Sequence, residues 1–195
     1  MITLEDAPAL LADGRPATLR PMIPTDWTAV EALFGATSEA NLYTRFFTTG
    51  RGAVESHLRH LFDSVDGPSV LLLESDGRLM GIADVERIDS VTSEVAFLVA
   101  DDAHGLGVAT LLLEQVAEDA RHTGVEWLVA DVLAVNHPML TVFADAGFTI
   151  AVETDRGEAV VRLSTVRTAE VEAASHARHV RAEQARQLNA VVAAG

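Results

Sequence analysis

The sequence lacks several residue types on which common protein chemistry depends. It has no cysteine, which excludes disulfides, thiolate nucleophiles and cysteine-based metal sites. It has no lysine either, because all 14 basic residues are arginines, and it has one tyrosine. Without lysine, the Walker A phosphate loop is excluded.

Basic residues are also few relative to acidic ones. The 195 residues include 14 basic and 29 acidic side chains, which give a formal net charge of −15. Nucleic-acid binding needs basic patches, so we expect no nucleic-acid partner. The acidic surface either attracts cationic partners or serves only solubility.

Long apolar runs are absent as well. No uninterrupted run approaches the roughly 20 residues of a membrane span. The acidic start, MITLEDAPALLADGRP, lacks the basic region of a signal peptide. Together with the absence of cysteine, these features predict a cytoplasmic protein with no membrane partner. The length predicts a single domain with a sizeable core.

Apolar periodicity and turn residues divide the chain into alternating elements. The expected strands are 16–22, 69–75, 78–88, 93–100, 125–134, 148–154 and 158–164. The expected helices are 24–36, with Thr25 or Asp26 as N-cap, 38–47, 53–65, 106–123, 138–146 and 167–193. This order predicts the α/β class, with a central mixed sheet flanked by helices and a long C-terminal helix.

The segment DDAHGLGVATLLLEQ, residues 101–115, places Gly105 and Gly107 between a strand and a helix. Such a loop offers backbone N–H groups and the positive end of a helix dipole to an anion. A Rossmann fingerprint needs a third glycine, where this chain has Ala109 and Thr110. Two interpretations remain from the pattern alone: an anion seat, or glycines that only allow tight packing of strand against helix.

Residues 99–148 resemble the core of the GCN5-related N-acetyltransferases, the GNAT superfamily. The signature of that family is Gln/Arg-x-x-Gly-x-Gly/Ala. Gly107 and Ala109 match it, and His104 stands where Gln or Arg is usual. The family's Asn-led helix ending in Gly-Phe is matched by Asn136, Gly147 and Phe148. The resemblance spans about residues 17–164 and implies the splayed sheet of that fold.

The resemblance implies that the glycine loop binds the pyrophosphate of acetyl-CoA. Amides from Leu106 to Thr110 would form the seat, and a bulky residue at Gly105 or Gly107 would displace the diphosphate. The pantetheine arm would lie where strand 93–100 splays from the next strand. The residues expected at the cofactor are Phe97, Leu98, Val99, His104, Gly105, Leu106, Gly107, Val108, Ala109, Thr110, Asn136, Met139 and Phe143.

An amine substrate must lose a proton before it attacks the thioester, so a carboxylate near the splay is the natural base. Glu94 stands where many GNAT enzymes carry their glutamate, and Glu86 and Asp84 are its competitors. Strand alternation places Glu94, Ala96 and Leu98 on one face. Many family members protonate the departing thiolate with a tyrosine at the position of Phe143. The one tyrosine here is Tyr43, so either no phenol acts or Tyr43 reaches over.

Residues 11–47 resemble the start of the bacterial Pat-type protein lysine acetyltransferases. The matching positions are Leu19, Arg20, Pro21, Pro24, Asp26, Ser38, Glu39, Leu42, Tyr43, Arg45, Phe46 and Phe47. The resemblance implies an acetyl-CoA-dependent N-acetyltransferase whose favoured acceptor is a protein lysine. A small cationic amine, such as a polyamine or an antibiotic, is the alternative acceptor. A non-catalytic module that binds acyl-CoA is the alternative outside the enzyme class.

The expected division places the GNAT domain in residues 1–165 and a helical extension in residues 166–195. The terminal helix either covers the sheet or forms a homodimer contact. No metal site is expected, since His176 and His179 are close in sequence but no clear third ligand follows them.

Overall fold

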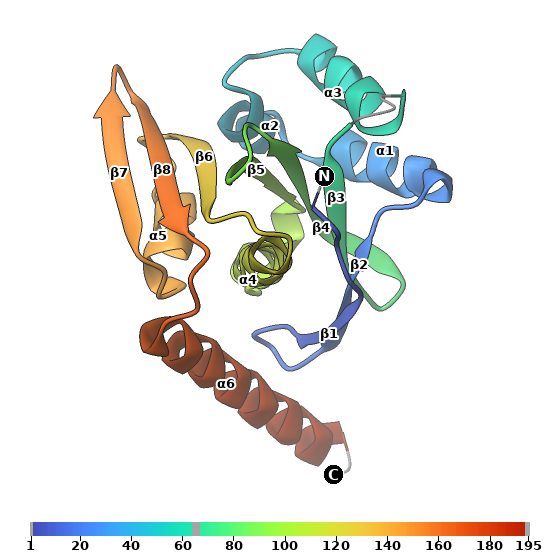
Figure 1. Cartoon of the computed structure of the whole chain (residues 1–195). Coiled ribbons are helices and arrows are strands. Elements are labelled where there is room, and N and C mark those ends of the chain that lie inside the picture. Colours follow the sequence, from blue (N-terminus) through green and yellow to red (C-terminus); the bar gives the residue numbers. More distant parts are fainter. Residues whose placement is uncertain (1, 64–66, 194–195) are drawn as a thin grey trace.

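The computed structural model describes residues 2–63 and 67–193, so the last two residues of the expected helix 53–65 lie outside the described residues. The described chain forms an eight-stranded sheet with helices on both faces (Figure 1). The strands are β1 (Ala7–Leu10), β2 (Pro16–Pro21), β3 (Ser69–Ser75), β4 (Arg78–Arg87), β5 (Thr92–Val99), β6 (Trp127–Leu133), β7 (Ile150–Asp155) and β8 (Glu158–Ser164). The helices are α1 (Trp27–Ala36), α2 (Glu39–Phe46), α3 (Arg51–Asp63), α4 (Val108–His122), α5 (His137–Asp145) and α6 (Ala169–Ala193), with short 3-10 turns η1 (Pro24–Asp26) and η2 (Asp101–Ala103).

The sheet order is β1-β2-β3-β4-β5-β6-β8-β7. Every neighbouring pair is antiparallel except β5 and β6, which are parallel. The expected mixed sheet is therefore confirmed, and so is the α/β class. Strand β1 was not expected, because it is four residues long, contains Pro8 and shows no clear alternation.

The helices form two layers around the sheet. Helices α1 to α3 lie on one side of it, while α4 and α5 lie on the other (Figure 1). Strand β3 is buried along most of its length, as expected for a strand covered on both faces. Helix α4 presents a fully buried apolar stripe to the sheet, made of Leu112, Leu113, Val116, Ala117 and Ala120. Each large side chain of this kind contributes about 1.5–3 kcal/mol of hydrophobic stabilisation.

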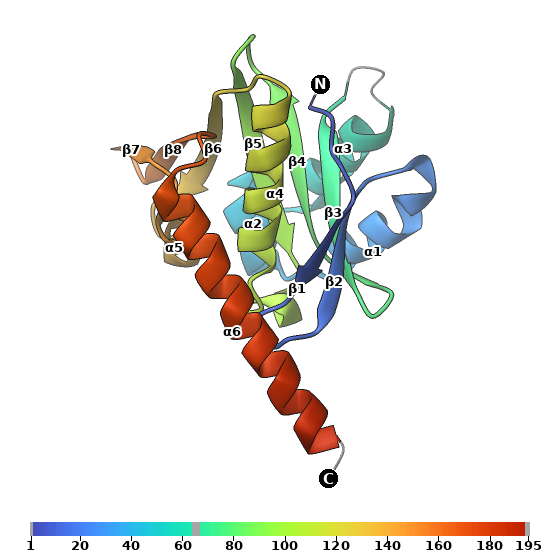
Figure 2. The same ribbon diagram turned by 60° about the horizontal axis from the view of Figure 1, so that its bottom comes forward.

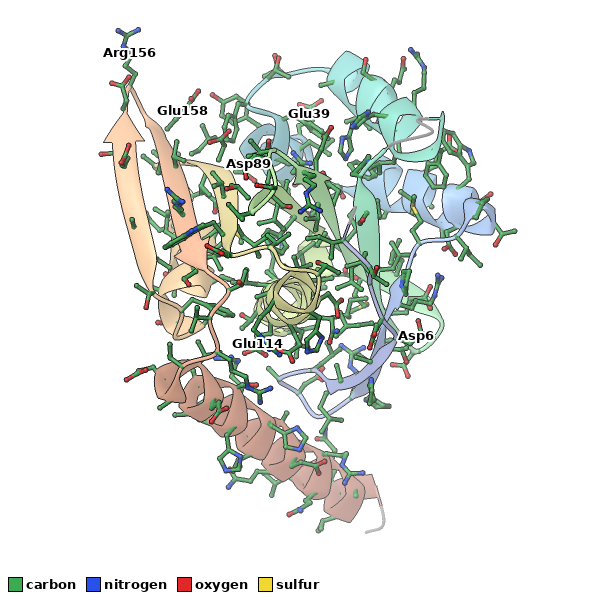
Figure 3. The ribbon with its side chains drawn as sticks, in the orientation of Figure 1. Asp6, Glu39, Asp89, Glu114, Arg156 and Glu158 are labelled. Carbon is green, nitrogen blue, oxygen red and sulfur yellow. The ribbon has the colours of Figure 1, made fainter. Side chains whose placement is uncertain are left out.

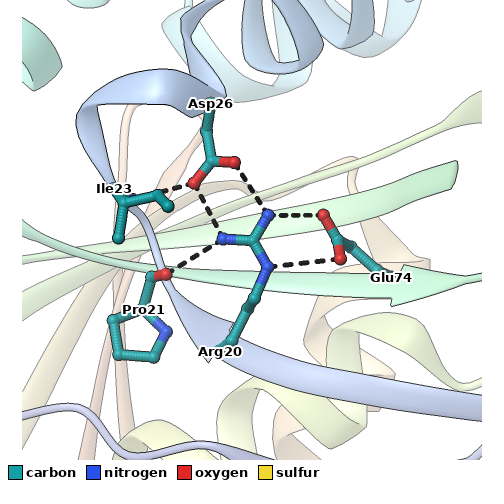
Figure 4. Close-up of polar contacts among 5 residues, drawn as sticks. All are labelled: Arg20, Pro21, Ile23, Asp26 and Glu74. Carbon is teal, nitrogen blue, oxygen red and sulfur yellow. Dashed lines mark hydrogen bonds and ion pairs between the residues drawn. The ribbon is translucent and has the colours of Figure 1, made fainter. Parts of the chain in front are cut away.

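An ion-pair network holds the start of α1 against the sheet (Figure 4). The guanidinium of Arg20 donates to both carboxylate oxygens of Asp26, each at 2.8 Å, and to both oxygens of Glu74, at 2.6 and 3.2 Å. Asp26 also accepts from the Ile23 N–H at 2.8 Å. Asp26 precedes α1 as expected, but its side chain makes no capping hydrogen bond to that helix. The motif therefore ties β2 to β3 and to the helix start.

Helix α6 packs across α4 and the edge strand β1 rather than over the middle of the sheet (Figure 2). The Asn189 amide donates to the Asp13 carbonyl at 2.8 Å, and Arg167 pairs with Glu118 of α4 at 3.8 Å. The C-terminal part of α6 extends past the body of the molecule. None of the helices in the described ranges is both long and apolar enough to span a membrane.

Candidate functional site

The site begins where β5 and β6 separate. Their parallel pairing covers only three residues of each strand, and Glu94 opposite Val129 is the last pair. Beyond that point β5 continues beside β4 alone, while β6 continues beside β8. The expected splay is therefore present, with Glu94 at its apex and Phe97 to Val99 along its open edge.

The open edge of β5 is held in place by α2. The Asn41 amide donates to the carbonyl of Val99 at 2.8 Å and to a carboxylate oxygen of Asp101 at 2.7 Å. Ser38, which caps the start of α2, also contacts Asp101 through its N–H at 2.8 Å. These contacts were not foreseen, because they join residues about 60 positions apart.

The glycine loop joins η2 to α4 at the far end of the open edge. Gly105 and Gly107 have φ values of +79° and +80°, which only glycine adopts without strain. A Cβ would meet nothing within 4 Å at Gly105 and only the Ala12 Cβ, at 4.0 Å, at Gly107. The two glycines are therefore required by their backbone conformation rather than by tight packing against the described chain, and the anion seat stays a prediction.

The amides at the start of α4 are free donors. Within the described chain, the N–H groups of Gly107, Val108, Ala109 and Thr110 have no acceptor. The Leu106 N–H donates to Ala103 at 3.3 Å, so the loop offers donors from Gly107 onward. Four successive N–H groups at a helix N-terminus suit a diphosphate, because the helix dipole adds positive potential there. The residues present fit the phosphates of acetyl-CoA.

The loop is braced from outside by the turn between β1 and β2. The Ala12 N–H donates to the Leu106 carbonyl at 2.9 Å. A backbone contact of this kind leaves no pattern in the sequence, and β1 itself was not expected. The N-terminal hairpin thus takes part in holding the loop.

Apolar side chains line the sheet side of the splay. The rings of Phe97 and Phe143 meet edge to face, with centroids 6.2 Å apart, and Phe143 is fully buried. Asn136 caps α5 by accepting from the Met139 N–H at 3.2 Å. Met139 is half-buried against the core. These residues lie at the expected place and present no charge.

The carboxylates lie on the opposite face of β4 and β5. The register pairs Glu86 with Glu94, Asp84 with Ala96 and Ile82 with Leu98, without a bulge. Directly opposed residues share a face. The three candidate bases, Glu94, Glu86 and Asp84, therefore share one face. Glu86 lies directly opposite Glu94, and Asp84 lies one residue pair further along that face.

The three carboxylates differ in their surroundings. Asp84 accepts two hydrogen bonds from the Arg45 guanidinium, at 2.9 and 3.0 Å. Burial alone would raise the pKa of Asp84, but Arg45 and His57 lower it below its ordinary value. Glu86 pairs with His60 at 3.2 Å. The Glu94 side chain has no hydrogen bond or ion pair within the described residues. Partial burial, with the Asp131 carboxylate adding to it, raises the pKa of Glu94 above its ordinary value.

Two other expected residues stand apart from this cluster. His104 is exposed, and its Nε2 lies 3.4 Å from the Asn41 amide nitrogen. Tyr43 is 42% exposed on α2. Neither side chain is fixed toward the splay by a contact.

A cavity of about 580 Å³ lies on the outer side of α4, between β1, α4 and α6. Gly105, Leu106 and Gly107 form part of its wall, whereas Glu94 does not. The candidate base and the open strand edge lie at the splay rather than in this cavity. Among the described residues, no group of three or more His, Asp or Glu side chains is placed to hold a metal ion.

Comparison with known proteins supports the same fold. Residues 37–148 match the model of the Acetyltransferase (GNAT) family. The GNAT domain of S. lividans PAT is 29% identical with a TM-score of 0.73, and the match covers 82% of this chain and 96% of that domain. The yncA structure from Salmonella typhimurium, which contains acetyl-CoA, is 21% identical with a TM-score of 0.56 over 78% of this chain and 96% of that one.

A third structure shares the fold at lower identity. Mycobacterium smegmatis RimJ, in complex with CoA-disulfide, is 16% identical with a TM-score of 0.65, covering 89% of this chain and 94% of that one. The family match takes in α2, the open edge of β5, the glycine loop and the Asn-led helix. This chain belongs to the GNAT family of acetyltransferases.

Proposed function

We propose that this protein transfers the acetyl group of acetyl-CoA to a primary amine, with Glu94 as the general base and a protein lysine as the favoured acceptor. The observation that carries the proposal is the position of Glu94. It is the last β5 residue paired with β6, so it lies at the apex of the splay whose other end carries the glycine loop.

The cofactor assignment is supported by the chain's own donors. Free N–H groups from Gly107 to Thr110 would bind the diphosphate, and the open edge at Phe97 to Val99 would run beside the pantetheine arm. The Val99 carbonyl already accepts from Asn41, so backbone pairing with the arm falls mainly on Phe97. Asn136, Met139 and Phe143 would flank the arm from α5. His104 would contribute its backbone position only, because its side chain is exposed.

Glu94 suits the role of base for an ammonium group. A carboxylate with a raised pKa is a better proton acceptor than an ordinary one, and within the described residues no cation forms an ion pair with the Glu94 side chain. It would take the proton from the amine, which then attacks the thioester carbonyl in one ternary complex. An acyl-cysteine route is closed, because the chain has no cysteine.

The thiolate that leaves needs a proton, and no phenol is placed to give one. Phe143 is buried against Phe97, and Tyr43 is exposed on α2. We infer that water, or the proton released from the ammonium, serves instead.

The acceptor is inferred from two supports. The chain is similar to the GNAT domain of S. lividans PAT over 82% of its length. The face that bears Glu94 also bears Glu86 and Asp84, with the Asp131 carboxylate nearby, which suits a cationic side chain. We place the acetyltransferase domain in residues 1–165 and a helical extension in residues 166–195. Exposed apolar residues of that extension, Leu188, Val191 and Val192 among them, are available for a homodimer contact.

The experiment measures thiol release from acetyl-CoA with a lysine-bearing protein and, separately, with a polyamine. The proposal expects turnover with the protein, loss of it in Glu94→Gln, and unchanged binding of CoA by that variant. Glu158→Gln is the control, because Glu158 is an exposed carboxylate at the tip of the β7–β8 hairpin (Figure 3). Turnover with the polyamine alone would point to a small amine, and CoA binding without any turnover would point to a sensor module.

A further inference from the structure

A nearly buried ion pair lies beside Glu94. The Nη2 of Arg45 donates to both carboxylate oxygens of Asp84, at 3.0 and 2.9 Å. The two side chains are 16% and 13% exposed. Arg45 comes from α2 and Asp84 from β4, so the pair joins a helix to the strand next to β5.

The register fixes where the pair lies relative to Glu94. Asp84 is opposite Ala96, and Glu86 is opposite Glu94, so Asp84 lies one residue pair further along the same face, toward the open part of the splay. The pair therefore borders the region that an amine must cross to reach Glu94.

Charged or titratable side chains from four elements lie around Glu94 or its neighbouring carboxylates. Strand β4 contributes Glu86 and Asp84, and β6 contributes Asp131. Helix α2 contributes the Arg45 guanidinium. Helix α3 contributes His57, whose Nε2 lies 3.6 Å from Asp84, and His60, which pairs with Glu86 at 3.2 Å.

The balance among these charges depends on one cation. Glu94 has carboxylates at three neighbouring positions, and Arg45 is the permanently charged cation that opposes them. Like charges favour the protonated form of a carboxyl group, and a nearby guanidinium favours the ionised form. A protonated Glu94 could not accept a proton from the ammonium.

We propose that the Arg45–Asp84 ion pair is a positioning element for acetyl transfer, which neutralises Asp84 and sets the charge that Glu94 experiences. This rests on the proposed role of Glu94 as base. It assigns a function to α2 and to the Arg45 of the "SEANLYTRFF" motif, beyond their contribution to packing.

The pair predicts opposite effects from its two members. Asp84→Asn removes a negative charge and leaves Arg45 facing Glu94, so the pKa of Glu94 falls. Arg45→Gln leaves Asp84 without its cation, so the pKa of Glu94 rises. Each shift is about 0.5–1 pH unit, as expected for charges several ångströms apart at a partly solvated site. A purely structural pair would give loss of stability in both variants and no opposite shifts.

The experiment follows the side-chain carboxyl resonance of Glu94 by ¹³C NMR as a function of pH in the whole chain, and the acid limb of kcat/KM in parallel. Arg45→Lys keeps the charge and should restore the wild-type midpoint. Arg78→Gln, which breaks the exposed Arg78–Asp102 pair, should leave it unchanged. Thermal unfolding reports whether each variant is folded, and Arg45→Met, which also removes the charge, replaces Arg45→Gln if that variant is not folded.

Two shifts of opposite sign support the inference. Shifts of the same sign, or none, in folded variants overturn it. The NMR titration needs no turnover, so it separates this inference from the proposed function. If Glu94→Gln keeps its activity while the shifts are opposite, the base assignment fails and the charge coupling stands.

Discussion

The two faces of the β4–β5 region carry different kinds of candidate functional group. On the α4 face, the candidate cofactor groups are main-chain amides at the helix start and the uncharged side chains Phe97 and Phe143. On the α2 face, the candidate chemistry is carried by charged side chains, with Glu94 near the Arg45–Asp84 pair. Under the proposed function, the backbone would recognise the cofactor and charged side chains would handle the proton.

A half-buried and a buried carboxylate show the same contrast. Asp84, on the α2 face, has a lowered pKa because Arg45 and His57 favour its charged form. Asp119, on α4, has no cation within salt-bridge distance among the described residues, and burial raises its pKa to about 6. A carboxylate that is paired with a cation can stay ionised in the site, whereas a buried carboxylate without a cation lowers the stability of the fold.

Replacing the base should give the largest effect and should affect one face only. We expect Glu94→Gln to lower kcat by about 10²–10⁴-fold, the usual contribution of general-base catalysis. The affinity for CoA, measured by calorimetry, should stay unchanged because the amides of α4 are untouched. If the variant binds CoA much more weakly, the two faces are not separate.

The contact between α5 and α6 should give the next largest effect, on stability. A Cβ at Gly147 would lie 2.7 Å from the Glu170 carbonyl oxygen, at a φ of +82°. We expect Gly147→Ala to lower the free energy of unfolding by about 2–4 kcal/mol. The added Cβ would force the backbone at Glu170 to move, and the positive φ at position 147 would strain the new side chain. Chemical denaturation measures this.

Gly124→Ala is the matched control for Gly147→Ala. Gly124 has a φ of +79° and open space around it, so its variant carries the backbone strain alone. Equal losses in the two variants would contradict tight docking of α6 against the end of α5.

The glycine loop should lose cofactor affinity without losing the fold. We expect Gly107→Val to weaken CoA binding by about 10–100-fold, or 1.4–2.7 kcal/mol, because the side chain would enter the space in front of the free amides. Gly124→Val has nearly the same φ at the other end of α4 and should bind CoA normally. Calorimetry measures the affinity of both variants for CoA. Equal affinities would show that the glycine loop does not bind the cofactor.

The buried Asp119 should give the smallest effect, visible in the pH dependence of stability. The pKa of Asp119 is about 6 in the folded chain against an ordinary 3.8, so between these values the folded state binds a proton that the unfolded state does not. Stability therefore falls as the pH rises through this window. We expect Asp119→Asn to remove that fall and to stabilise the chain at pH 7 by about 1–2 kcal/mol. Urea unfolding at pH 4, 5.5 and 7 tests it, and an unchanged slope would contradict it.

Local signals in the sequence were enough for most of the fold. The strands Ser69–Ser75 and Glu158–Ser164 were predicted with their observed bounds, because turn residues flank each run. Helix α4 begins at Val108, two residues later than expected, because Leu106 still belongs to the glycine loop. The loop itself was predictable, since its glycines stand between a strand and a helix.

Contacts between distant segments were not predictable. Arg45 and Asp84 are 39 positions apart, and nothing local marks them as partners. The Ala12 contact to Leu106 joins two backbone groups, which carry no residue preference. The sequence indicates Glu94, Glu86 and Asp84 together as candidate bases, and only their contacts in the fold distinguish them.

Backbone NMR during titration with CoA tests most directly whether the main chain of α4 recognises the cofactor. We expect the amide protons of Gly107, Val108, Ala109 and Thr110 to move strongly downfield as each gains a phosphate acceptor, while those at the C-terminal end of α4 stay in place. Unmoved amides at these four positions in a chain that still binds CoA would contradict it.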